Sequence, residues 1–520
     1  MSEMEKLARD MADRGVPRVF GIPGSGASLV LLDALERRGV PFVLTHFEGT
    51  GALMAGAAAR LSGRAGAAIS IKGPGLANMV PGLAACRFDA MPVVSLSEAY
   101  LPGTPLEKAH KRMDHEGLLS AVAKGRRYIS GTGPGFDEMA SWAEAEAPGP
   151  VHLEIAESGV AEEAPVPDAE PLQPSPQALK RAVDLVEAAE RPLVVVGTLA
   201  LRRGLSARLN GISVPVFTTA AAKGAVDETL PQAAGVYTGA GRERSPEYTL
   251  LNRADAVICI GLRHQEVLGA RPFACRSLNV DPLGSEACSG FGFHGLVPDT
   301  DDALDAVFAA LREKSWGLDE VASCMRTVRS ALLRGGFLPA HAFRVIEDHL
   351  GPKARLVLDT GNFCTVGEHV WRVPEPGLYV AAGQGRYMGA GMPLALGAAL
   401  HDPSVPTVAV LGDGGVGMFL SEIKIAVRHG LPLLTVLMSD AGFGSVRARA
   451  VRDGLSRAPV TVSQPSWLKA FEGLGVASVK ARSESELLQG LGRWDPTAGP
   501  MYIEIPFDPE AYGAMVEGVR

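Results

Sequence analysis

Short apolar runs alternate with helical patterns along almost the whole chain, and this alternation constrains the fold more than any other feature. "RVFGIPG" (18–24) predicts a strand and a turn, and "SLVLLDALERRG" (28–39) predicts a helix that ends at glycine. "PFVLTHF" (41–47) then predicts the next strand. Such an alternation indicates parallel strands with helices on both faces of the sheet. The predicted fold class is α/β, with three doubly wound parallel-sheet domains.

The proposed division into three domains comes from a change of composition. Residues 160–176, "VAEEAPVPDAEPLQPSP", are rich in proline and acid and predict a linker. A stretch near residues 311–336 predicts a helical connector before the last unit. We therefore expect domains at residues 1–165, 176–315 and 340–520, each long enough to bury its own core.

The composition limits the classes of binding partner and the cellular compartment that we expect. With 50 basic and 58 acidic residues the net charge is −8, which argues against nucleic acid or an anionic membrane as the main partner. The six cysteines form no CxxC pair, so we expect reduced thiols and no zinc site. No apolar run is long enough to span a bilayer and the N-terminus lacks an apolar signal region, so we expect a cytoplasmic protein.

Two acids are predicted to meet at one sheet edge in the last unit. "TVAVL" (407–411) predicts a strand that ends at Gly412 and Asp413, and a helix of about four turns is then expected to run to His429. "LPLLTVLM" (431–438) predicts the next strand, which ends at Ser439-Asp440. Asp413 and Asp440 lie 27 residues apart, yet each follows the carboxyl end of a neighbouring parallel strand.

This pair of acids predicts a metal-bridged diphosphate site. Two converging carboxylates suit a hard divalent cation, magnesium before zinc. Gly414 and Gly415 would offer backbone N–H groups at the start of the expected helix, which suits a phosphate. The alternative is that "GDGG" is only a tight turn between a strand and a helix.

A third acid stands between a strand and a helix near the N-terminus. In "VLTHFEGTG" (43–51), Glu48 follows an apolar run and precedes a helix of small residues. A carboxylate at such a place is expected to be partly buried, and burial is unfavourable unless the group has partners. The alternative is a surface acid that caps the helix.

The motifs together resemble a known family. "FGIPG", "HFEGTGALMAGAAAR", "GPGLANMVPGLAACRFDAMPVV", "GQGRYMGAGMPLALGAAL" and "GDGG…SDAGFG" resemble the thiamine diphosphate-dependent enzymes of the acetolactate synthase and benzoylformate decarboxylase group. The resemblance covers nearly the whole chain. It implies the order pyrimidine-binding (PYR), central and diphosphate-binding (PP) domain.

The resemblance also implies roles for individual residues. Glu48 would be the catalytic carboxylate that hydrogen-bonds the aminopyrimidine ring, and Mg²⁺ would be held by Asp413, Asp440 and the carbonyl of Gly442. Met388 would press the cofactor into its bent form, although a plain core methionine is the alternative. "DTGN" (359–362) is expected to reach the diphosphate as well. The implied cofactor-binding set is Glu48, Gly73, Asn78, Arg386, Met388, Gly412, Asp413, Gly414, Gly415, Asp440, Gly442, Phe443 and Gly444.

The implied activity is decarboxylation of a 2-oxo acid, after which the remaining enamine joins a second carbonyl (carboligation). The alternative is simple decarboxylation to an aldehyde, and a minor alternative is a non-catalytic cofactor-binding protein. FAD in the central domain is a further expectation, on the analogy of acetolactate synthases. A homodimer or homotetramer with active sites at the subunit interface is implied too.

The chain departs from the family pattern at several positions. Ser439-Asp440 stands in place of the usual Asn-Asn pair, which adds a charge beside the metal. No His-His pair occurs, which argues against the pyruvate decarboxylase branch.

Four residues are candidates for contact with the substrate. Lys72, Lys111 and Arg112 predict a basic pocket for a substrate anion, as in phosphonopyruvate or sulfopyruvate, with solvated surface charge as the alternative. Ser25 stands where related enzymes use a serine near the substrate, and a plain turn serine is the alternative.

Overall fold

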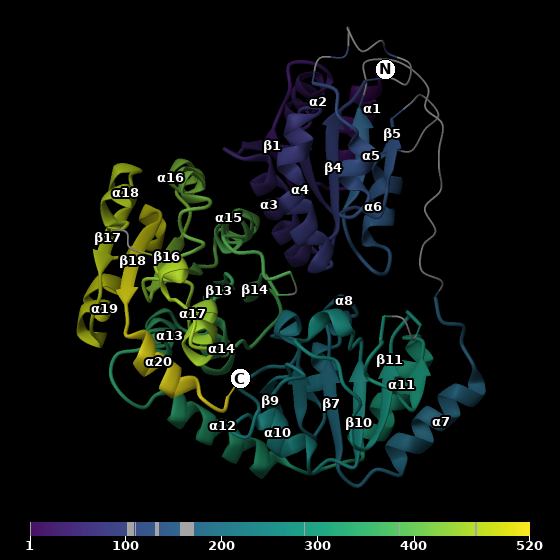
Figure 1. Ribbon diagram of the computed structural model, residues 1–520. Coiled ribbons are helices and arrows are strands. Elements are labelled where there is room, and N and C mark those ends of the chain that lie inside the picture. The colour runs from purple at the N-terminus through teal and green to yellow at the C-terminus, as the bar shows by residue number, and fades with distance from the viewer. Residues whose placement is uncertain are drawn as a thin grey trace.

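Three parallel sheets of six strands each, flanked by helices, make up the structure (Figure 1). This computed structural model describes residues 2–100, 104, 109, 111–129, 135–155, 171–284, 287–383, 385–462 and 465–519. Every strand pairing within the three sheets is parallel. The predicted α/β class with three doubly wound sheets is confirmed. Most of the predicted linker lies outside the described residues.

The first sheet has the strand order β2-β1-β3-β4-β6-β5. The chain steps from β1 outward to β2 and then back past β1 to β3, so the turns after β1 and β3 flank the point where the strand order reverses. Its strands are β1 (Val19–Ile22), β2 (Phe42–Leu44), β3 (Gly66–Ser70), β4 (Val93–Glu98), β5 (Arg126–Tyr128) and β6 (Val151–Ile155). Its helices are α1 (Glu3–Asp13), α2 (Ala27–Glu36), α3 (Glu48–Ser62), α4 (Pro74–Phe88), α5 (His115–Leu119) and α6 (Phe136–Glu144).

The second sheet has the order β12-β11-β10-β7-β8-β9, which reverses between β7 and β10. Its strands are β7 (Pro192–Val196), β8 (Val216–Thr218), β9 (Ala233–Val236), β10 (Ala256–Ile260), β11 (Arg276–Val280) and β12 (Gly295–Val297). The helices that accompany it are α7 (Pro176–Glu187), α8 (Leu199–Arg202), α9 (Ser206–Asn210), α10 (Pro246–Leu251) and α11 (Asp301–Arg312). The predicted helical connector is α12 (Leu318–Leu332).

The third sheet has the order β14-β13-β15-β16-β18-β17, which reverses between β13 and β15. Its strands are β13 (Arg355–Leu358), β14 (Tyr379–Ala381), β15 (Thr407–Gly412), β16 (Leu433–Ser439), β17 (Ala477–Lys480) and β18 (Met501–Pro506). Its helices are α13 (Pro339–Leu350), α14 (Phe363–Val370), α15 (Gly391–His401), α16 (Ile423–His429), α17 (Gly444–Arg452), α18 (Leu468–Gly473), α19 (Glu484–Leu491) and α20 (Pro509–Val516).

Two small-residue helices join the first and third units. Helices α3 and α15 are buried along almost their whole length and share one hydrophobic core (Figure 1). Gly397 of α15 lies so close to Met54 of α3 that a Cβ atom there would stand 2.5 Å from the Met54 carbonyl oxygen. Glycine and alanine are therefore needed at this contact because larger side chains would push the two helices apart.

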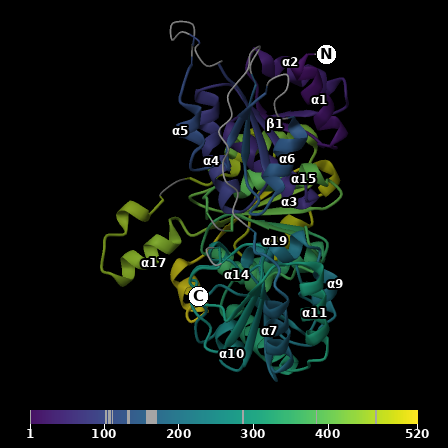
Figure 2. The same ribbon diagram turned by 90° about the vertical axis from the view of Figure 1, so that its right-hand side faces the viewer.

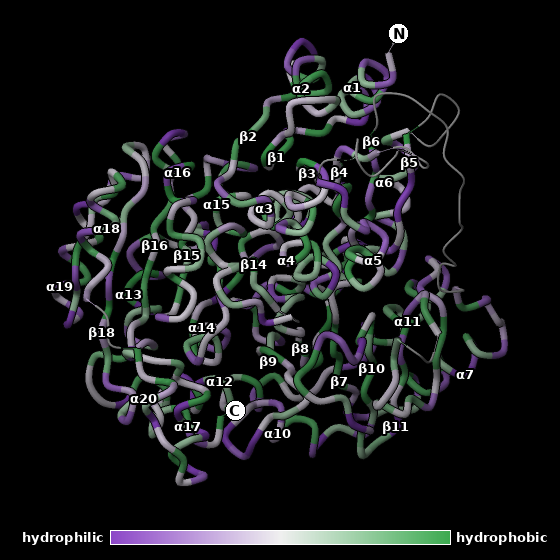
Figure 3. Tube along the Cα trace, turned by 45° about the horizontal axis from the view of Figure 1, so that its top comes forward, coloured by the Kyte–Doolittle hydropathy of each residue, from purple (hydrophilic) through white to green (hydrophobic). Residues whose placement is uncertain are grey.

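Hydrophobic residues are concentrated along the sheet strands, for instance β1 and β16, whereas surface helices such as α1 alternate between hydrophobic and hydrophilic residues (Figure 3). The six cysteines are free thiols, as the sequence predicted. Among the described residues, no helix is both long enough and apolar enough to cross a membrane.

The predicted helix of about four turns after the "GDGG" motif is wrong. The residues after Asp413 form turns, a short 3₁₀ helix follows at Leu420–Glu422, and only then does α16 begin at Ile423. Gly414, Gly415 and Gly417 lie in this stretch, and glycine is a poor helix former because it loses the most backbone entropy. Any ligand held by these glycines therefore meets the N–H groups of a turn rather than a helix N-terminus.

Candidate active site

Asp413 and Asp440 lie side by side at the carboxyl edge of the third sheet. Strands β15 and β16 are paired in parallel, with Gly412 opposite Met438. The Asp413 side chain accepts hydrogen bonds from the Ser439 hydroxyl at 2.8 Å and from the Asp440 backbone N–H at 2.9 Å. Asp413 is only 7% exposed. The structure thus brings together the two acids that the sequence placed on neighbouring strands.

Arg447, which the sequence analysis did not identify, compensates the charge of Asp440. Its guanidinium donates to the Asp440 carboxylate at 2.6 Å and to the Asp440 carbonyl oxygen at 2.9 Å. Burial raises the pKa of Asp440 to about 6; Arg447 opposes this rise, and the neighbouring Asp413 adds to it. The arginine therefore offsets the negative charge that Asp440 brings in place of asparagine. The spacing of seven residues between Asp440 and Arg447 matches no motif, so the sequence did not predict this contact.

The glycines around these acids are packed too closely by their neighbours to carry a side chain. A Cβ atom on Gly414 would stand 2.5 Å from the Met388 sulfur, and one on Gly442 would stand 2.6 Å from the Arg447 guanidinium. Cβ atoms on Gly415 and Gly444 would collide with the carboxylates of Asp359 and Asp440. Carboxylate and carbonyl oxygens beside bare backbone are the donor set that Mg²⁺ and a diphosphate require, so the residues fit such a group.

Asp359 organises the turn that carries Met388. Its carboxylate is 1% exposed and accepts hydrogen bonds from the backbone N–H groups of Gly389 at 2.9 Å and Gly391 at 3.2 Å. Burial raises the pKa of Asp359 to about 7, and the backbone hydrogen bonds oppose the rise. Asp359 thus holds the segment after Met388 against the glycine turn. Contact of residues 359–362 with a diphosphate stays a prediction.

Glu48 is the first residue of α3, and it is not a surface capping acid. It is 7% exposed, and its carboxylate accepts a hydrogen bond from the Asn78 side chain at 3.1 Å. A Cβ atom on Gly75 would stand 3.3 Å from the same carboxylate. The turn at residues 73–75 therefore packs closely against Glu48, without room for a side chain at Gly75. Glu48, Gly73 and Asn78 thus form one group within the first unit.

Glu422 fixes the segment that carries Glu48. Its side chain is fully buried, and it accepts hydrogen bonds from the His46 backbone N–H at 3.1 Å and the Thr50 hydroxyl at 2.9 Å. The His46 ring nitrogen Nδ1 lies 3.1 Å from the same carboxylate. His46 and Thr50 stand two residues before and after Glu48. The third unit therefore positions Glu48 through a residue that lies nine positions after Asp413.

The residues predicted to contact the substrate lie at the carboxyl edge of the first sheet. Lys72, Lys111 and Arg112 line one cavity, as the predicted basic pocket requires. Lys72 is ion-paired with Glu98 at 2.9 Å, so it is not an uncompensated cation. Ser25 is exposed in the turn before α2 and does not line this cavity. Glu98 holds that turn through the Gly26 backbone N–H at 3.0 Å.

Arg386 does not stand next to Asp413 or Asp440 in the sequence, and it lies beside the second sheet. It lines a small cavity with Tyr237, Thr238 and Glu266 at the edge of the second sheet. Its backbone has a φ of +47°, which is the left-handed region. The predicted cofactor-binding residues therefore divide into a group near Glu48, a group near Asp413, and Arg386 beside the second sheet.

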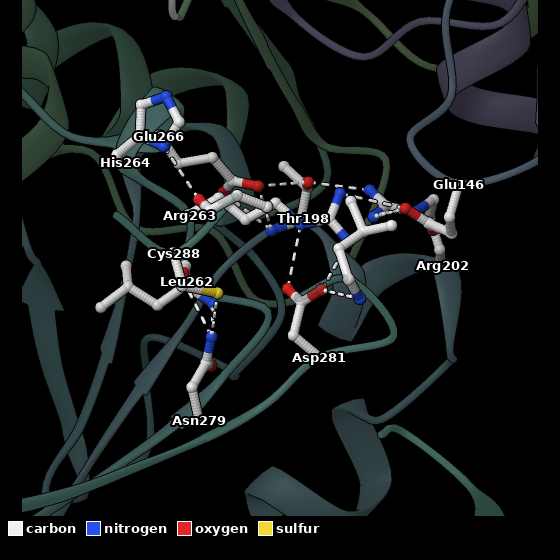
Figure 4. Close-up of polar contacts among 12 residues, drawn as sticks. Glu146, Thr198, Arg202, Leu262, Arg263, His264, Glu266, Asn279, Asp281 and Cys288 are labelled. Atoms are coloured by element: carbon white, nitrogen blue, oxygen red, sulfur yellow. Dashed lines mark hydrogen bonds and ion pairs between the residues drawn. The ribbon is translucent and has the colours of Figure 1, made fainter. Parts of the chain in front are cut away.

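A carboxylate fills the phosphate position of the second sheet. Glu266 accepts hydrogen bonds from the Thr198 backbone N–H at 2.9 Å and the Thr198 hydroxyl at 2.6 Å (Figure 4). It also accepts one from the Thr219 hydroxyl at 2.7 Å. Thr198 stands just after β7, at the point where the strand order reverses. Dinucleotide-binding sheets hold the pyrophosphate of their ligand at this place. Arg202 and Glu146 continue the network from Thr198 to the first unit.

This arrangement defines a class of protein: an α/β protein with two neighbouring acids and a glycine turn at the carboxyl edge of one sheet and a half-buried carboxylate at the edge of another. Three family models match the chain: the N-terminal TPP binding domain of thiamine pyrophosphate enzymes at residues 1–114, their central domain at 179–306, and their C-terminal TPP binding domain at 359–505. The chain belongs to the thiamine pyrophosphate enzyme family. The resemblance inferred from the motifs is confirmed.

Relatives with different names align along nearly the whole chain. A probable acetolactate synthase large subunit of Methanocaldococcus jannaschii is 26% identical over 98% of this chain and 92% of its own length. A probable 2-ketoarginine decarboxylase of Pseudomonas aeruginosa is 26% identical over 96% of this chain and 93% of its own. Human 2-hydroxyacyl-CoA lyase 2 is 25% identical over 93% of this chain and 85% of its own. Relatives named as synthase, decarboxylase and lyase therefore have similar sequence identity to this chain.

Replacing Glu422 tests its positioning role. Glu422→Gln keeps the side-chain shape but turns one acceptor into a donor, so one N–H or O–H group of His46 or Thr50 loses its partner. We expect the free energy of unfolding to fall by about 2 kcal/mol, measured by denaturant titration, and cofactor-dependent turnover to fall about tenfold or more because Glu48 is misplaced. Ser421→Ala, at an exposed neighbouring position, should change neither quantity. A Glu422→Gln enzyme with normal stability and turnover would contradict this role.

The raised pKa of Asp359 predicts a pH dependence of stability. Between the ordinary carboxyl value of 3.8 and about 7 the folded protein holds a proton that the unfolded chain has lost. Asp359 therefore lowers the free energy of unfolding as pH rises through this range, by up to roughly 4 kcal/mol. Asp359→Asn cannot titrate, so its unfolding temperature relative to the wild type should rise between about pH 5 and about pH 8, without Mg²⁺ or cofactor. A difference that does not change with pH would contradict the raised pKa.

Proposed function

We propose that this chain is a thiamine diphosphate- and Mg²⁺-dependent enzyme that decarboxylates a 2-oxo acid and joins the remaining fragment to a second carbonyl compound. The observation that carries the proposal is the pairing of two groups. One is the buried Glu48 with its Asn78 partner, and the other is the cluster of Asp413, Asp440 and bare glycine backbone. The acetolactate synthase names among the relatives support joining of two substrates.

The two ends of the proposed site have different tasks. Asp413, Asp440 and the Gly442 carbonyl would bind Mg²⁺, and the backbone at Gly414, Gly415 and Gly444 would face the diphosphate. When bound, the cofactor supplies the electron sink for decarboxylation. Gly412 and Phe443 complete this end, and Met388 lies directly over Gly414.

Glu48 would hold a proton at a ring nitrogen of the aminopyrimidine. Its burial favours this role because a carboxylate in a dry site gains from sharing a proton with a bound base. Asn78 orients the Glu48 carboxylate through their hydrogen bond. Glu422 holds the turn in which Glu48 stands.

Simple decarboxylation to an aldehyde is the second candidate. The relative named as a 2-ketoarginine decarboxylase supports it. The two reactions share Glu48 and the metal site and differ only in whether a second carbonyl compound or a proton accepts the fragment. Analysis of the organic product therefore separates them.

We infer further that two copies of the chain complete each active site, in a homodimer or homotetramer. Within one chain, the Glu48 carboxylate bonds to Asn78 of the first unit, whereas Asp413 and Asp440 bond to residues of the third unit. A second copy would bring the two groups onto one cofactor.

The central activity prediction concerns Glu48. With thiamine diphosphate and Mg²⁺, we expect carbon dioxide release from at least one member of a panel of 2-oxo acids, and a longer hydroxy-keto product by mass spectrometry. Glu48→Gln should lower the rate by about 100-fold or more, because general acid–base catalysis contributes that much. Glu36→Gln, at an exposed position at the end of α2, should keep the wild-type rate. Full activity in Glu48→Gln would disprove the proposed mechanism.

We infer that the central domain holds no flavin. Glu266 occupies the position of a pyrophosphate and would repel one, and Thr198 and Thr219 already donate to it. Purified protein should therefore lack absorbance near 450 nm, and denaturation should release no FAD into the supernatant. Stoichiometric FAD in the purified protein would contradict this inference.

A further inference from the structure

A cavity of about 300 Å³ opens beside the Glu48 group, at the carboxyl edge of the first sheet. Its walls include Lys72, Lys111, Arg112 and Arg126, together with Tyr100 and Tyr128. Its lining comes from residues at or next to β4, β5 and β6, from residues 111–116, and from Lys72 in the turn after β3. Ligands of open α/β sheets bind outside the carboxyl ends of the strands.

One glycine turn separates this cavity from Glu48. A Cβ atom on Gly73 would collide with the carbonyl of Lys111, and one on Gly75 would approach the Glu48 carboxylate to 3.3 Å. Gly73 itself has a φ of +64°, which favours glycine. The tightly packed turn at residues 73–75 is therefore the wall that the cavity shares with the Glu48 group.

The floor of the cavity is charged but internally neutralised. Arg126 forms ion pairs with Glu154 at 3.3 Å and with Glu116 at 2.8 Å. Lys72 is paired with Glu98, and this carboxylate is itself buried and bonded to the Ser28 hydroxyl at 2.6 Å. These two cations have carboxylate partners within the chain, so they set the shape of the floor rather than its net charge.

The histidines behind the floor of the cavity, His115 and His152, also have hydrogen-bond partners at their ring nitrogens, so they do not form a metal site. The Gly73 N–H donates to His115 Nε2 at 3.0 Å. Nε2 is therefore an acceptor, and Nδ1 carries the hydrogen that faces Glu154 at 3.0 Å. His152 uses both ring nitrogens, on the hydroxyls of Ser95 and Ser97 at 2.8 and 2.9 Å. Burial lowers the pKa of His152 to about 3, which leaves its ring neutral.

Lys111 and Arg112 are the cations of the cavity that lack a carboxylate partner among the described residues. Both are exposed at its wall, and Arg112 donates to the Thr104 carbonyl at 2.6 Å. Lys111 has a φ of +65°, a left-handed conformation that lysine rarely adopts. Backbone strain of this kind persists where the surroundings impose it, and it is concentrated at ligand sites. Here the contact with Gly73 imposes it.

We propose that this cavity binds a second anionic group of the substrate, so that the enzyme prefers 2-oxo acids with a distal carboxylate, sulfonate or phosphonate. Lys111 and Arg112 are the residues that select this group, and Tyr100 and Tyr128 line the cavity beside them. The proposal rests on the proposed 2-oxo acid chemistry and adds the substrate class. It also assigns different roles to the three basic residues that the sequence predicted. Lys72 has a structural role in the cavity wall, whereas Lys111 and Arg112 bind the anionic group.

The test compares substrates of similar length that differ in distal charge. Carbon dioxide release is measured with 2-oxoglutarate, sulfopyruvate and phosphonopyruvate, and with the neutral-tailed 2-oxobutyrate and 2-oxovalerate. We expect at least one anionic-tailed acid to exceed both neutral-tailed acids about tenfold in kcat/KM, with the advantage shrinking as salt is added. Equal or greater kcat/KM for the neutral-tailed acids would overturn the proposal while leaving the 2-oxo acid chemistry intact.

Variants of Lys111 and Arg112 test whether these two residues select substrates with a distal anionic group. Lys111→Met and Arg112→Met should each raise KM for the preferred acid about tenfold, with kcat and the neutral-tailed substrates changed less than twofold. Lys111→Asn provides a second variant, because asparagine tolerates the left-handed backbone, and it should behave like Lys111→Met. Lys6→Met, at an exposed position on α1, is the control. Unchanged KM in all three variants would overturn the assignment.

A binding measurement separates failure of the pocket from failure of the chemistry. Sulfoacetate carries two anionic groups and no reactive carbonyl, and its affinity for the wild type and for Lys111→Met can be compared by calorimetry. We expect the variant to bind it about tenfold more weakly. If no acid releases carbon dioxide but this difference is found, the proposed reaction fails and the anion pocket stands. Equal sulfoacetate affinities would overturn the pocket whatever the activity.

Discussion

Each of the three sheets has a buried or half-buried carboxylate at the point where its strand order reverses, and the donors around that carboxylate decide what the edge can bind. A carboxylate away from water is tolerated only when hydrogen bonds satisfy it. Glu98 ties together the turns after β1 and β3 of the first sheet. Glu266 does the same at β7 and β8, and Asp359 at β13 and the segment after β14.

What each sheet edge can bind differs, because the carboxylate accepts hydrogen bonds from different groups in each sheet. In the second sheet, Glu266 uses the donors that a nucleotide phosphate would need, so the edge is closed. In the third, Asp359 bonds to the backbone beyond Met388 and packs against Gly415 of the glycine turn after Asp413. In the first, Glu98 neutralises Lys72, and Glu116 and Glu154 neutralise Arg126. Among the described residues, the cations of the neighbouring cavity without a carboxylate partner are Lys111 and Arg112. The same type of sheet thus occurs three times in the chain, and the groups at its carboxyl edge differ each time.

Charge balance explains how the proposed metal site tolerates a departure from the family pattern. An aspartate at position 440 adds a negative charge beside Asp413, and burial makes that charge unfavourable. Arg447 returns a positive charge at 2.6 Å. The pair is more than four-fifths buried on both sides, so water does little to screen it. The arginine and the aspartate therefore have to be considered together when the metal affinity of this chain is compared with that of its relatives.

Most of the fold was predictable from the sequence, because β-branched and apolar runs such as 407–411 form strands wherever helices separate them. The short strands β5 (Arg126–Tyr128) and β14 (Tyr379–Ala381) were not predicted. The helix after Asp413 was predicted too long, because a hydrophobic pattern does not show that glycines keep the chain in turns.

The sequence by itself determined the class of the fold, the family, and which acids face the carboxyl edges of strands, because these depend on local patterns and on the order of the motifs. Only the tertiary structure decided how those acids are satisfied. Glu422 reaches Thr50 across 372 positions, and Lys72 meets Glu98 across 26. Spacing in the sequence cannot reveal such partners, because the folded sheets set the distances between them. The same distances determine which cations remain to meet a substrate.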